Sequence, residues 1–334
     1  MKIQIIGFGV IGQGFSRVLL KKKDELEKRT GEDIRVVSIT DISGTAYNGK
    51  GIDLEKALEI VKNSGKIIDY PEARKISGLE AIEEIEADFV LELTPSNIKT
   101  GEPGLSHMLA AMKAGKHLVT SNKAPLALKF KKLVETAEKN GVEFRYEATV
   151  GGAMPIINLA RETLSADRIL SIEGILNGTT NYILTRMTQE GAEFEHVLKE
   201  AQQLGYAETD PTYDIGGIDT ASKLVILANA LMGMNATYKD VKTRGITGIT
   251  PEAIKLARES GYVIKLIGEV KNGILEVAPR LVNVSHPLNV GGALNVAMLT
   301  CDIAGEITVA GKGAGAIETN SAILSDIISI TGRW

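Results

Sequence analysis

The chain has 334 residues, 44% of them hydrophobic, and a formal net charge of −4 at pH 7. A chain longer than about 250–300 residues usually divides into domains, so we expect two hydrophobic cores. The acidic balance excludes a basic surface for nucleic acid or anionic lipid, because the longest run of lysines, at 21–23, is followed at once by Asp24 and Glu25.

The cysteine, histidine and hydropathy patterns favour a cytoplasmic protein that does not enter a membrane. The single cysteine, Cys301, excludes an internal disulfide, and the four histidines show no metal-ligand spacing. The N-terminus enters an apolar strand without the layout of a signal peptide, and the apolar run at 224–234 is too short to span a bilayer.

Residues 1–130 alternate short β-rich runs with longer stretches of helical period. Strands are predicted at 2–6, 34–39, 87–93 and 117–121. Helices are predicted after residue 10 as far as Gly31, at 54–61 and at 105–114. The alternation predicts an α/β fold, a Rossmann-like doubly wound parallel sheet, for a nucleotide-binding domain at 1–130.

Beyond residue 130 the amino-acid composition changes, with more glycine and threonine. We expect a connecting segment at 131–150 and a second, α+β domain at 151–304, with strands at 169–176 and 274–282. The glycine turn and amphipathic pattern within 305–334 predict a C-terminal helix that returns to the first domain.

The stretch "GFGVIG" at 7–12 follows the first strand and opens the first helix. In this context a GxGxxG pattern lets the chain turn tightly, approach a pyrophosphate closely and present a helix N-terminus to the anion. A glycine-rich turn that binds nothing is the alternative.

Three further residues each follow a predicted strand, namely Asp41, Thr94 and Lys123. Ligands of open α/β sheets bind beyond the carboxyl ends of the strands, so these residues and Gly7 would line one crevice. Asp41 can accept hydrogen bonds from ribose hydroxyls, and no Arg or Lys follows it before Lys50, which favours NAD over NADP. An ordinary turn aspartate and an exposed turn lysine are the alternatives.

Two polar stretches lie in the second domain. "LNGTTNYIL" at 176–184 places Asn and Thr where they can cap a helix or leave N–H groups for an anion. "GYAETDPTYDIGGIDTASKL" at 205–224 sets Glu208, Asp210, Asp214 and Asp219 ahead of Lys223. The carboxylates either form a solvated surface or await a cation, and Asp219 with Lys223 could be a surface pair worth only about 0.3–0.5 kcal/mol.

Taken together, these motifs resemble homoserine dehydrogenase. The similar stretches are "GFGVIG", "ELTPSN", "TSNKAPLA", "YEATVGGAMPIINLARETL", "GILNGTTNYILTRM" and "EAQQLGYAETDPTYDIGGIDTASKL". The resemblance implies reversible oxidation of L-homoserine to L-aspartate 4-semialdehyde with NAD or NADP, a step of threonine, methionine and isoleucine biosynthesis. It also implies that the second domain carries catalysis and dimerisation, so the expected assembly is a homodimer.

The resemblance also implies a role for individual residues. Lys223 and Lys123 would be catalytic, with Asp219 beside Lys223. Substrate binding would fall to Glu208, Asp214, Tyr206, Gly178 and Thr179. Cofactor binding would fall to Gly7, Phe8, Gly9, Val10, Ile11, Gly12, Asp41, Thr94, Ser96, Lys123 and Gly313.

A monovalent cation, Na⁺ or K⁺, is a further implication of the resemblance. Glu147 and the backbone oxygens of Val150, Gly152 and Met154, in "EATVGGAM", match the family's cation site. Gly152 and Ala153 reverse the order found in some members, a small departure because backbone carbonyls do the binding.

The proton chemistry leaves one question open in the sequence. A lysine can accept the hydroxyl proton when burial or a second lysine lowers its pKa, whereas a neighbouring aspartate pulls the other way. Which lysine moves the proton is therefore undecided.

A different NAD(P)-dependent amino-acid oxidoreductase and a catalytically silent NAD(P) sensor are the alternative functions, although neither explains the carboxylate set together with two lysines. A chain of this length leaves no room for a fused kinase or an effector domain, so we expect no feedback control.

Overall fold

The computed structural model describes residues 1–332. The chain forms two compact units. The first consists of Met1–Thr149 and the C-terminal segment from Gly315, and the second is Val150–Ala314. Among residues 1–332, no helix combines the length and the apolar character that crossing a membrane requires.

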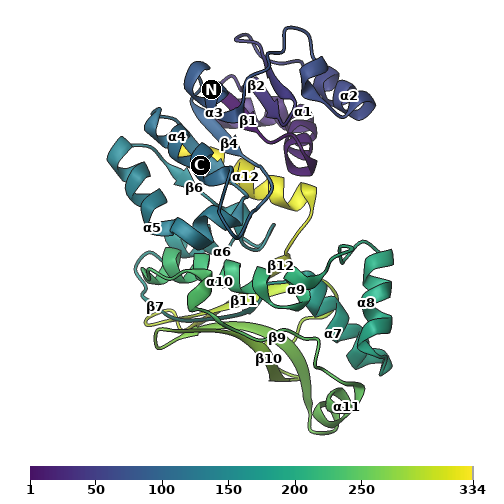
Figure 1. Ribbon diagram of the computed structural model, residues 1–334. Coiled ribbons are helices and arrows are strands. Elements are labelled where there is room, and N and C mark those ends of the chain that lie inside the picture. Colours follow the sequence, from purple (N-terminus) through teal and green to yellow (C-terminus); the bar gives the residue numbers. More distant parts are fainter. Residues whose placement is uncertain (333–334) are drawn as a thin grey trace. The chain divides into compact units, whose positions relative to one another are not determined.

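The first unit is built on a sheet with the strand order β3-β2-β1-β4-β5-β6 (Figure 1). Its strands are β1 (Lys2–Ile6), β2 (Arg35–Asp41), β3 (Gly44–Tyr47), β4 (Phe89–Glu92), β5 (His117–Thr120) and β6 (Phe144–Arg145). Neighbouring strands are parallel except for β2 and β3, which form an antiparallel hairpin. The predicted doubly wound sheet is confirmed. The antiparallel edge is a difference, because the two residues between β2 and β3 cannot make the long crossover that a parallel strand needs.

Helices cover both faces of this sheet. They are α1 (Val10–Thr30), α2 (Leu54–Ser64), α3 (Gly78–Glu84), α4 (Gly104–Lys113), α5 (Lys123–Asn140) and α12 (Ala316–Ile330), with short 3₁₀ turns at Ile67–Asp69 and Glu147–Thr149. One hydrophobic cluster joins α1, α2 and α12 to the sheet and contains Phe15, Leu19 and Ile323. As predicted, α1 ends at Gly31, whose φ of 68° suits glycine at a helix C-terminus.

The C-terminal helix α12 packs against α1, as expected (Figure 1). Asn320 donates a hydrogen bond from Nδ2 to the backbone oxygen of Ile11, 3.1 Å away. The contact joins the end of the chain to the helix that opens directly after the glycine motif.

The second unit contains a mixed sheet with the order β12-β11-β7-β9-β10-β8. The strands are β7 (Ile169–Ile175), β8 (Lys242–Thr243), β9 (Tyr262–Lys271), β10 (Ile274–Asn283), β11 (Leu294–Cys301) and β12 (Glu306–Lys312). All pairs are antiparallel except β8 with β10. This sheet and its helices confirm the expected α+β class.

The helices of the second unit carry most of its polar stretches. They are α6 (Ile156–Asn158), α7 (Gly178–Glu190), α8 (Phe194–Gln203), α9 (Thr212–Ile215), α10 (Ile218–Met232) and α11 (Pro251–Glu259), with a π-helical turn at Leu159–Thr163 and a 3₁₀ turn at Tyr238–Asp240. Helix α10 packs on the sheet at β7, β9 and β10. Residues from Ala221 to Asn229 are buried all round this helix, which is why its sequence lacks a polar face.

The unit boundaries differ from the expected ones in two places. Residues 131–149 belong to the first unit, because α5 runs on to Asn140 and β6 extends the sheet. Residues 306–312 form β12 in the second unit, so the returning segment begins at Gly315 and not at 305. The last two residues of the expected C-terminal segment, 333–334, lie outside the described residues.

Candidate active site

A crevice of about 1160 Å³ opens in the first unit at the carboxyl ends of β1, β2 and β4. Gly7, Phe8, Gly9, Val10 and Ile11 line it. Gly7 has φ +102°, and a Cβ on Gly12 would lie 2.4 Å from the Gly7 oxygen, so both positions require glycine. A Cβ on Gly9 would meet no atom within 4 Å, so the surrounding protein gives no reason for glycine there. Gly9 is the position at which a bound phosphate would come closest to the backbone.

Asp41 lines the same crevice, at the end of β2. Its Oδ1 accepts from the backbone N–H of Ser43 at 2.6 Å, and its Oδ2 accepts from the backbone N–H of Ile67 at 2.8 Å. The carboxylate therefore also fixes the turn around itself. Lys75 lines the crevice too, although it lies 34 residues after Asp41 in the sequence and was not predicted to be near it.

Thr94 and Ser96 lie on the crevice wall beyond β4. The Thr94 hydroxyl donates to the carboxylate of Glu92, a residue with no exposed surface. Asn122 donates from Nδ2 to the Thr94 hydroxyl at 3.3 Å and accepts from the Ser96 hydroxyl at 2.8 Å. These hydrogen bonds hold the side chains of Thr94 and Ser96 in fixed positions, so a ligand would contact a preorganised surface.

Lys123 begins α5, and Asn122 is the N-cap of that helix. The lysine is half-buried. Lys123 is not among the residues that line the crevice, unlike Gly7, Asp41 and Thr94, so the expected set is brought together only in part. His107 does line the crevice, with its Nδ1 3.6 Å from the Glu92 carboxylate.

The second unit contains a buried ion pair. The Nζ of Lys223 lies 2.8 Å from Oδ2 of Asp219, and the two side chains are 9% and 7% exposed. Lys223 also donates to the backbone oxygen of Leu176, at 2.6 Å. The burial rules out the solvated surface pair, and losing one partner of a buried pair is costly, about 3–5 kcal/mol.

Asp214 is linked to this pair by Asn177, which contacts both Asp214 and Asp219. Asn177 donates from Nδ2 to Oδ1 of Asp214 at 2.7 Å and to Oδ2 of Asp219 at 2.9 Å. The side-chain oxygen of Asn177 caps α7 by accepting from the backbone N–H of Thr180 at 2.9 Å. The capping predicted for this stretch is confirmed.

The start of α7 also holds the loop that carries the acidic residues. Thr179 donates its hydroxyl to the backbone oxygen of Tyr206 at 2.6 Å, and the Tyr206 ring stacks on Tyr182 with 4.6 Å between centroids. A Cβ on Gly178 would lie 2.8 Å from the Ala293 oxygen, so this position also requires glycine. Glu208 is exposed further along the loop.

The four residues of the expected cation site fall on both sides of the unit boundary. Glu147 is 2% exposed and its backbone N–H donates to Asp326 at 2.9 Å, within the first unit. Val150 and Met154 are fully buried in the second unit. Gly152 has φ +58°, and the backbone oxygens of Lys312 and Gly313 lie 2.9 Å from the position its Cβ would take.

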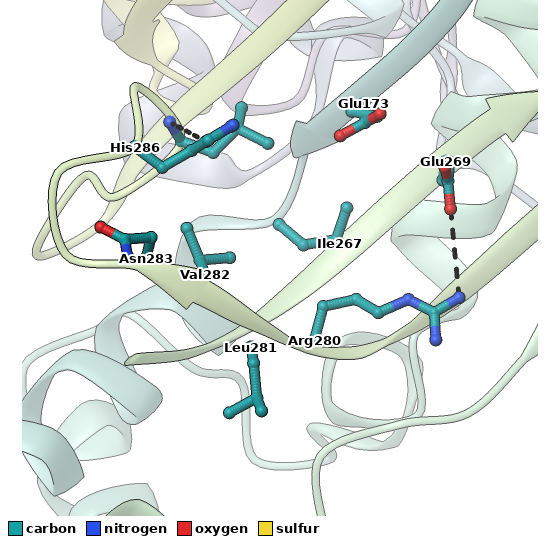
Figure 2. Close-up of a pocket in the computed structure, with 9 residues that line it drawn as sticks. Glu173, Ile267, Glu269, Arg280, Leu281, Val282, Asn283 and His286 are labelled. Atoms are coloured by element: carbon teal, nitrogen blue, oxygen red, sulfur yellow. Dashed lines mark hydrogen bonds and ion pairs between the residues drawn. The ribbon is translucent and has the colours of Figure 1, made fainter. Parts of the chain in front are cut away.

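A smaller cleft, of about 230 Å³, lies on the second sheet where β7, β9 and β10 meet (Figure 2). Glu173 and Glu269 are paired across β7 and β9, and the Arg280 guanidinium reaches toward Glu269, 4.0 Å away. Ile267 and Val282 line its apolar part. This cleft is lined by two carboxylates and one arginine. Its lining residues do not include a glycine turn or a helix N-terminus like those of the larger crevice.

Three residues of these networks were not singled out from the sequence, namely Glu92, His107 and Asn122, and Asn177 was expected only as a helix cap. One of them had a sequence signal, because Glu92 is a charged residue inside an otherwise apolar strand. The partners of Asn177 are 37 and 42 residues away, so no local pattern indicated them.

The first unit has the crevice of a dinucleotide-binding protein, and the second has a buried lysine among carboxylates. Both features fit an NAD(P)-dependent oxidoreductase, in which the cofactor takes a hydride and an ionisable side chain handles the proton.

Comparison with known proteins identifies the family. The family model "Homoserine dehydrogenase" matches residues 155–328, and "Homoserine dehydrogenase, NAD binding domain" matches residues 7–147. A homoserine dehydrogenase of Methanocaldococcus jannaschii is 59% identical over 331 residues, covering 99% of this chain and 98% of that protein.

Solved structures agree with these matches. An Archaeoglobus fulgidus crystal structure assigned to the same family is 46% identical with a TM-score of 0.92, over 99% of both chains. A hyperthermophilic archaeal homoserine dehydrogenase mutant in complex with NADPH is 29% identical with a TM-score of 0.88, over 100% of this chain and 98% of that one. The chain belongs to the homoserine dehydrogenase family of oxidoreductases.

Proposed function

We propose that this chain oxidises L-homoserine reversibly to L-aspartate 4-semialdehyde, with NAD or NADP as cofactor. The observation that carries the proposal is the buried Asp219–Lys223 pair in contact with Asn177, next to the carboxylate of Asp214. A lysine with this protection from solvent suits proton transfer, and a second carboxylate beside it suits a substrate ammonium group.

The crevice of the first unit fits the cofactor. Gly7 to Gly12 would hold the pyrophosphate at the start of α1, and Asp41 would accept from the ribose hydroxyls. Thr94, Ser96 and Gly313 complete the proposed contacts. The bound nicotinamide supplies one piece of chemistry, the acceptance of a hydride from the alcohol carbon.

Asp41 favours NAD in this proposal, because its carboxylate would repel a 2′-phosphate. Lys75, on the same crevice, is the residue that would attract one. Steady-state kinetics with each cofactor decides between them. An NADP preference of several orders of magnitude would overturn the preference for NAD.

The substrate would be held through its ammonium and carboxylate groups. Glu208 and Asp214 would pair with the ammonium, while Tyr206, Gly178 and Thr179 would surround the rest of the amino-acid end. Lys223 would accept the hydroxyl proton as the hydride leaves, and Asp219 would keep its Nζ in place. Lys123 is the second lysine of the proposed proton chemistry.

A monovalent cation, Na⁺ or K⁺, is part of the proposal. Its ligands would be Glu147 and the backbone oxygens of Val150, Gly152 and Met154, a set of oxygen donors that suits a hard cation. The left-handed backbone at Gly152 supports a tight carbonyl turn there. Titration of metal-free protein with NaCl, KCl and choline chloride, followed by thermal unfolding, tests it. Equal melting temperatures in all three salts would remove the cation from the proposal.

We also propose a cytoplasmic homodimer that pairs through the second sheet. The cleft of Figure 2 on this sheet is lined in part by the exposed Leu281, whereas Ile175, Val296 and Met298 of the sheet are buried within the chain. In Figure 1, α7 to α10 of this unit lie on the opposite face. Sedimentation equilibrium should give twice the chain mass, and a single-chain mass at micromolar concentration would contradict the dimer.

The test of the activity is direct. Purified protein is mixed with L-homoserine and NAD or NADP, and the absorbance of reduced nicotinamide is followed, with L-serine and L-threonine as matched alcohols. We expect turnover with homoserine well above that with either control. Cofactor binding without turnover of any alcohol would instead favour an NAD(P) sensor.

A further inference from the structure

We propose that Asn177 is a positioning residue that joins the proposed substrate-binding carboxylate to the proposed catalytic pair. Its side-chain nitrogen contacts Asp214 and Asp219 together, at 2.7 and 2.9 Å. The inference rests on the proposed function, and it concerns a residue whose local role is only that of a helix cap.

The orientation of the Asn177 amide is determined by its neighbours. Its oxygen accepts from the backbone N–H and the hydroxyl of Thr180, at 2.9 and 3.0 Å. Both N–H donors of its nitrogen go to carboxylates. A flipped amide would place an oxygen against two carboxylates and an N–H against a backbone N–H, so only one orientation satisfies every group.

The residue before Asn177 completes the arrangement. The backbone oxygen of Leu176 accepts from Lys223 at 2.6 Å, while Asn177 donates to Asp219, the anionic partner of the same lysine. Two consecutive residues between β7 and α7 thus contact both members of the ion pair. Asn177 is 5% exposed, so water does not readily replace it.

A neutral amide is well suited to this position. Two carboxylates that approach one atom repel each other, and a shared pair of N–H donors offsets that repulsion. An aspartate here would keep the helix cap but would replace the donor by a third negative oxygen.

This geometry gives Asn177 two effects. When a substrate ammonium group binds Asp214, the carboxylate is held in place against the same amide that fixes Asp219. Placement of the Lys223 side-chain nitrogen and binding of the substrate therefore depend on one side chain. A misplacement of about 1 Å at reacting groups can cost about 10²-fold in rate.

The test uses Asn177→Asp and Asn177→Ser, which both retain a helix-capping side chain. We expect each variant to lower kcat for homoserine by about 10²-fold and to raise KM for homoserine, with KM for the cofactor unchanged.

A matched control separates positioning from helix capping. Thr250→Ala removes the N-cap of α11 in the same unit, where the Thr250 hydroxyl accepts from Ala253 at 3.3 Å. It should lower the urea concentration at the midpoint of unfolding and leave both kinetic constants unchanged.

The outcomes separate this inference from the function on which it rests. Unaltered kcat and KM for homoserine in folded Asn177→Asp and Asn177→Ser, with Lys223→Ala inactive, would overturn the role of Asn177 alone. If the Asn177 variants lost no more activity than Thr250→Ala, Asn177 would act only as a helix cap. An unmodified chain without activity toward homoserine would overturn the proposed function itself.

Discussion

The two units build their candidate sites by different means. In the first, the crevice is shaped by backbone: glycines at 7 and 12, strand ends and a helix N-terminus. In the second, the site is a network of side chains from the N-cap of α7, from α9 and from α10, in which Asn177, Asp219 and Lys223 are buried. A backbone site depends on a short local pattern, whereas a side-chain site depends on contacts between distant residues. The two kinds of site should therefore respond differently to substitution.

The largest difference is expected for Lys223→Ala. It removes the group proposed to take the proton, so kcat should fall by about 10²–10⁴-fold while cofactor affinity stays the same. Lys255→Ala is the matched control, because Lys255 forms an i,i+4 pair with Glu259 that is largely exposed. Steady-state kinetics with circular dichroism as a folding check makes the measurement. A folded Lys223→Ala with near-normal kcat would remove the lysine from the mechanism.

A second test contrasts two glycines of the backbone site. In Gly12→Ala the new Cβ would lie 2.4 Å from a backbone oxygen, so the fold should lose about 1–3 kcal/mol even without cofactor. Gly9→Ala meets no protein atom within 4 Å, so it should leave the free protein intact and weaken NAD binding by about tenfold or more.

Urea denaturation and fluorescence titration with reduced cofactor measure the two effects of this glycine contrast. The backbone-site interpretation would be wrong if Gly9→Ala lost as much stability as Gly12→Ala while binding cofactor normally.

The third expected effect concerns a buried lysine that the mechanism does not use. Lys265 donates to Asn181, Thr185 and the backbone oxygen of Val290, at 2.7–3.1 Å. Burial lowers its pKa from 10.5 to about 8. Between these values the unfolded chain binds more protons than the folded one, so the free energy of unfolding should rise as pH increases from about 8 to 10.5.

The hydrogen bonds of Lys265 favour its charged form, so we expect the gain to be modest, about 1 kcal/mol. Lys265→Met should remove the gain, and Lys255→Met, at an exposed site, should retain it. Urea denaturation at pH 7.5 and 9.5 compares them. An equal pH response in Lys265→Met and the unmodified chain would show that another group is responsible.

The same contrast explains which parts of the molecule could be predicted from sequence. The strands at Lys2–Ile6 and Ile274–Asn283, the end of α1 at Gly31 and the return of α12 follow from local periodicity and glycine positions. The antiparallel β3 did not follow, since its pairing depends on a two-residue turn after Asp41. The unit boundary at Val150 also depends on contacts that a linear pattern does not contain.

Sequence was less informative about the candidate site. The glycine motif specified the crevice, because its residues are consecutive and their chemistry is that of the backbone. No local pattern in the sequence predicts that the backbone oxygen of Leu176 accepts a hydrogen bond from Lys223, 47 residues further along the chain. The importance of Asn177 likewise arises only when α7, α9 and α10 meet. The family resemblance suggested the roles proposed for Asp214 and Asp219, and the structure shows the amide that contacts both.

The smallest effects should come from the exposed acidic loop, where two neighbouring carboxylates are predicted to differ. Glu208→Gln removes a charge proposed to pair with the substrate ammonium in a solvated position, so KM for homoserine should rise about two- to fivefold, as for an exposed ion pair. Asp210 has no proposed ligand, and its Oδ1 accepts from the backbone N–H of Thr212 at 3.1 Å. Asp210→Asn keeps that acceptor and should leave both kinetic constants unchanged. Increasing salt should shrink the Glu208 effect, because exposed charges are screened. Equal rises in KM for the two variants would mean that the loop attracts the substrate through its total charge, and Glu208 would lose its specific role.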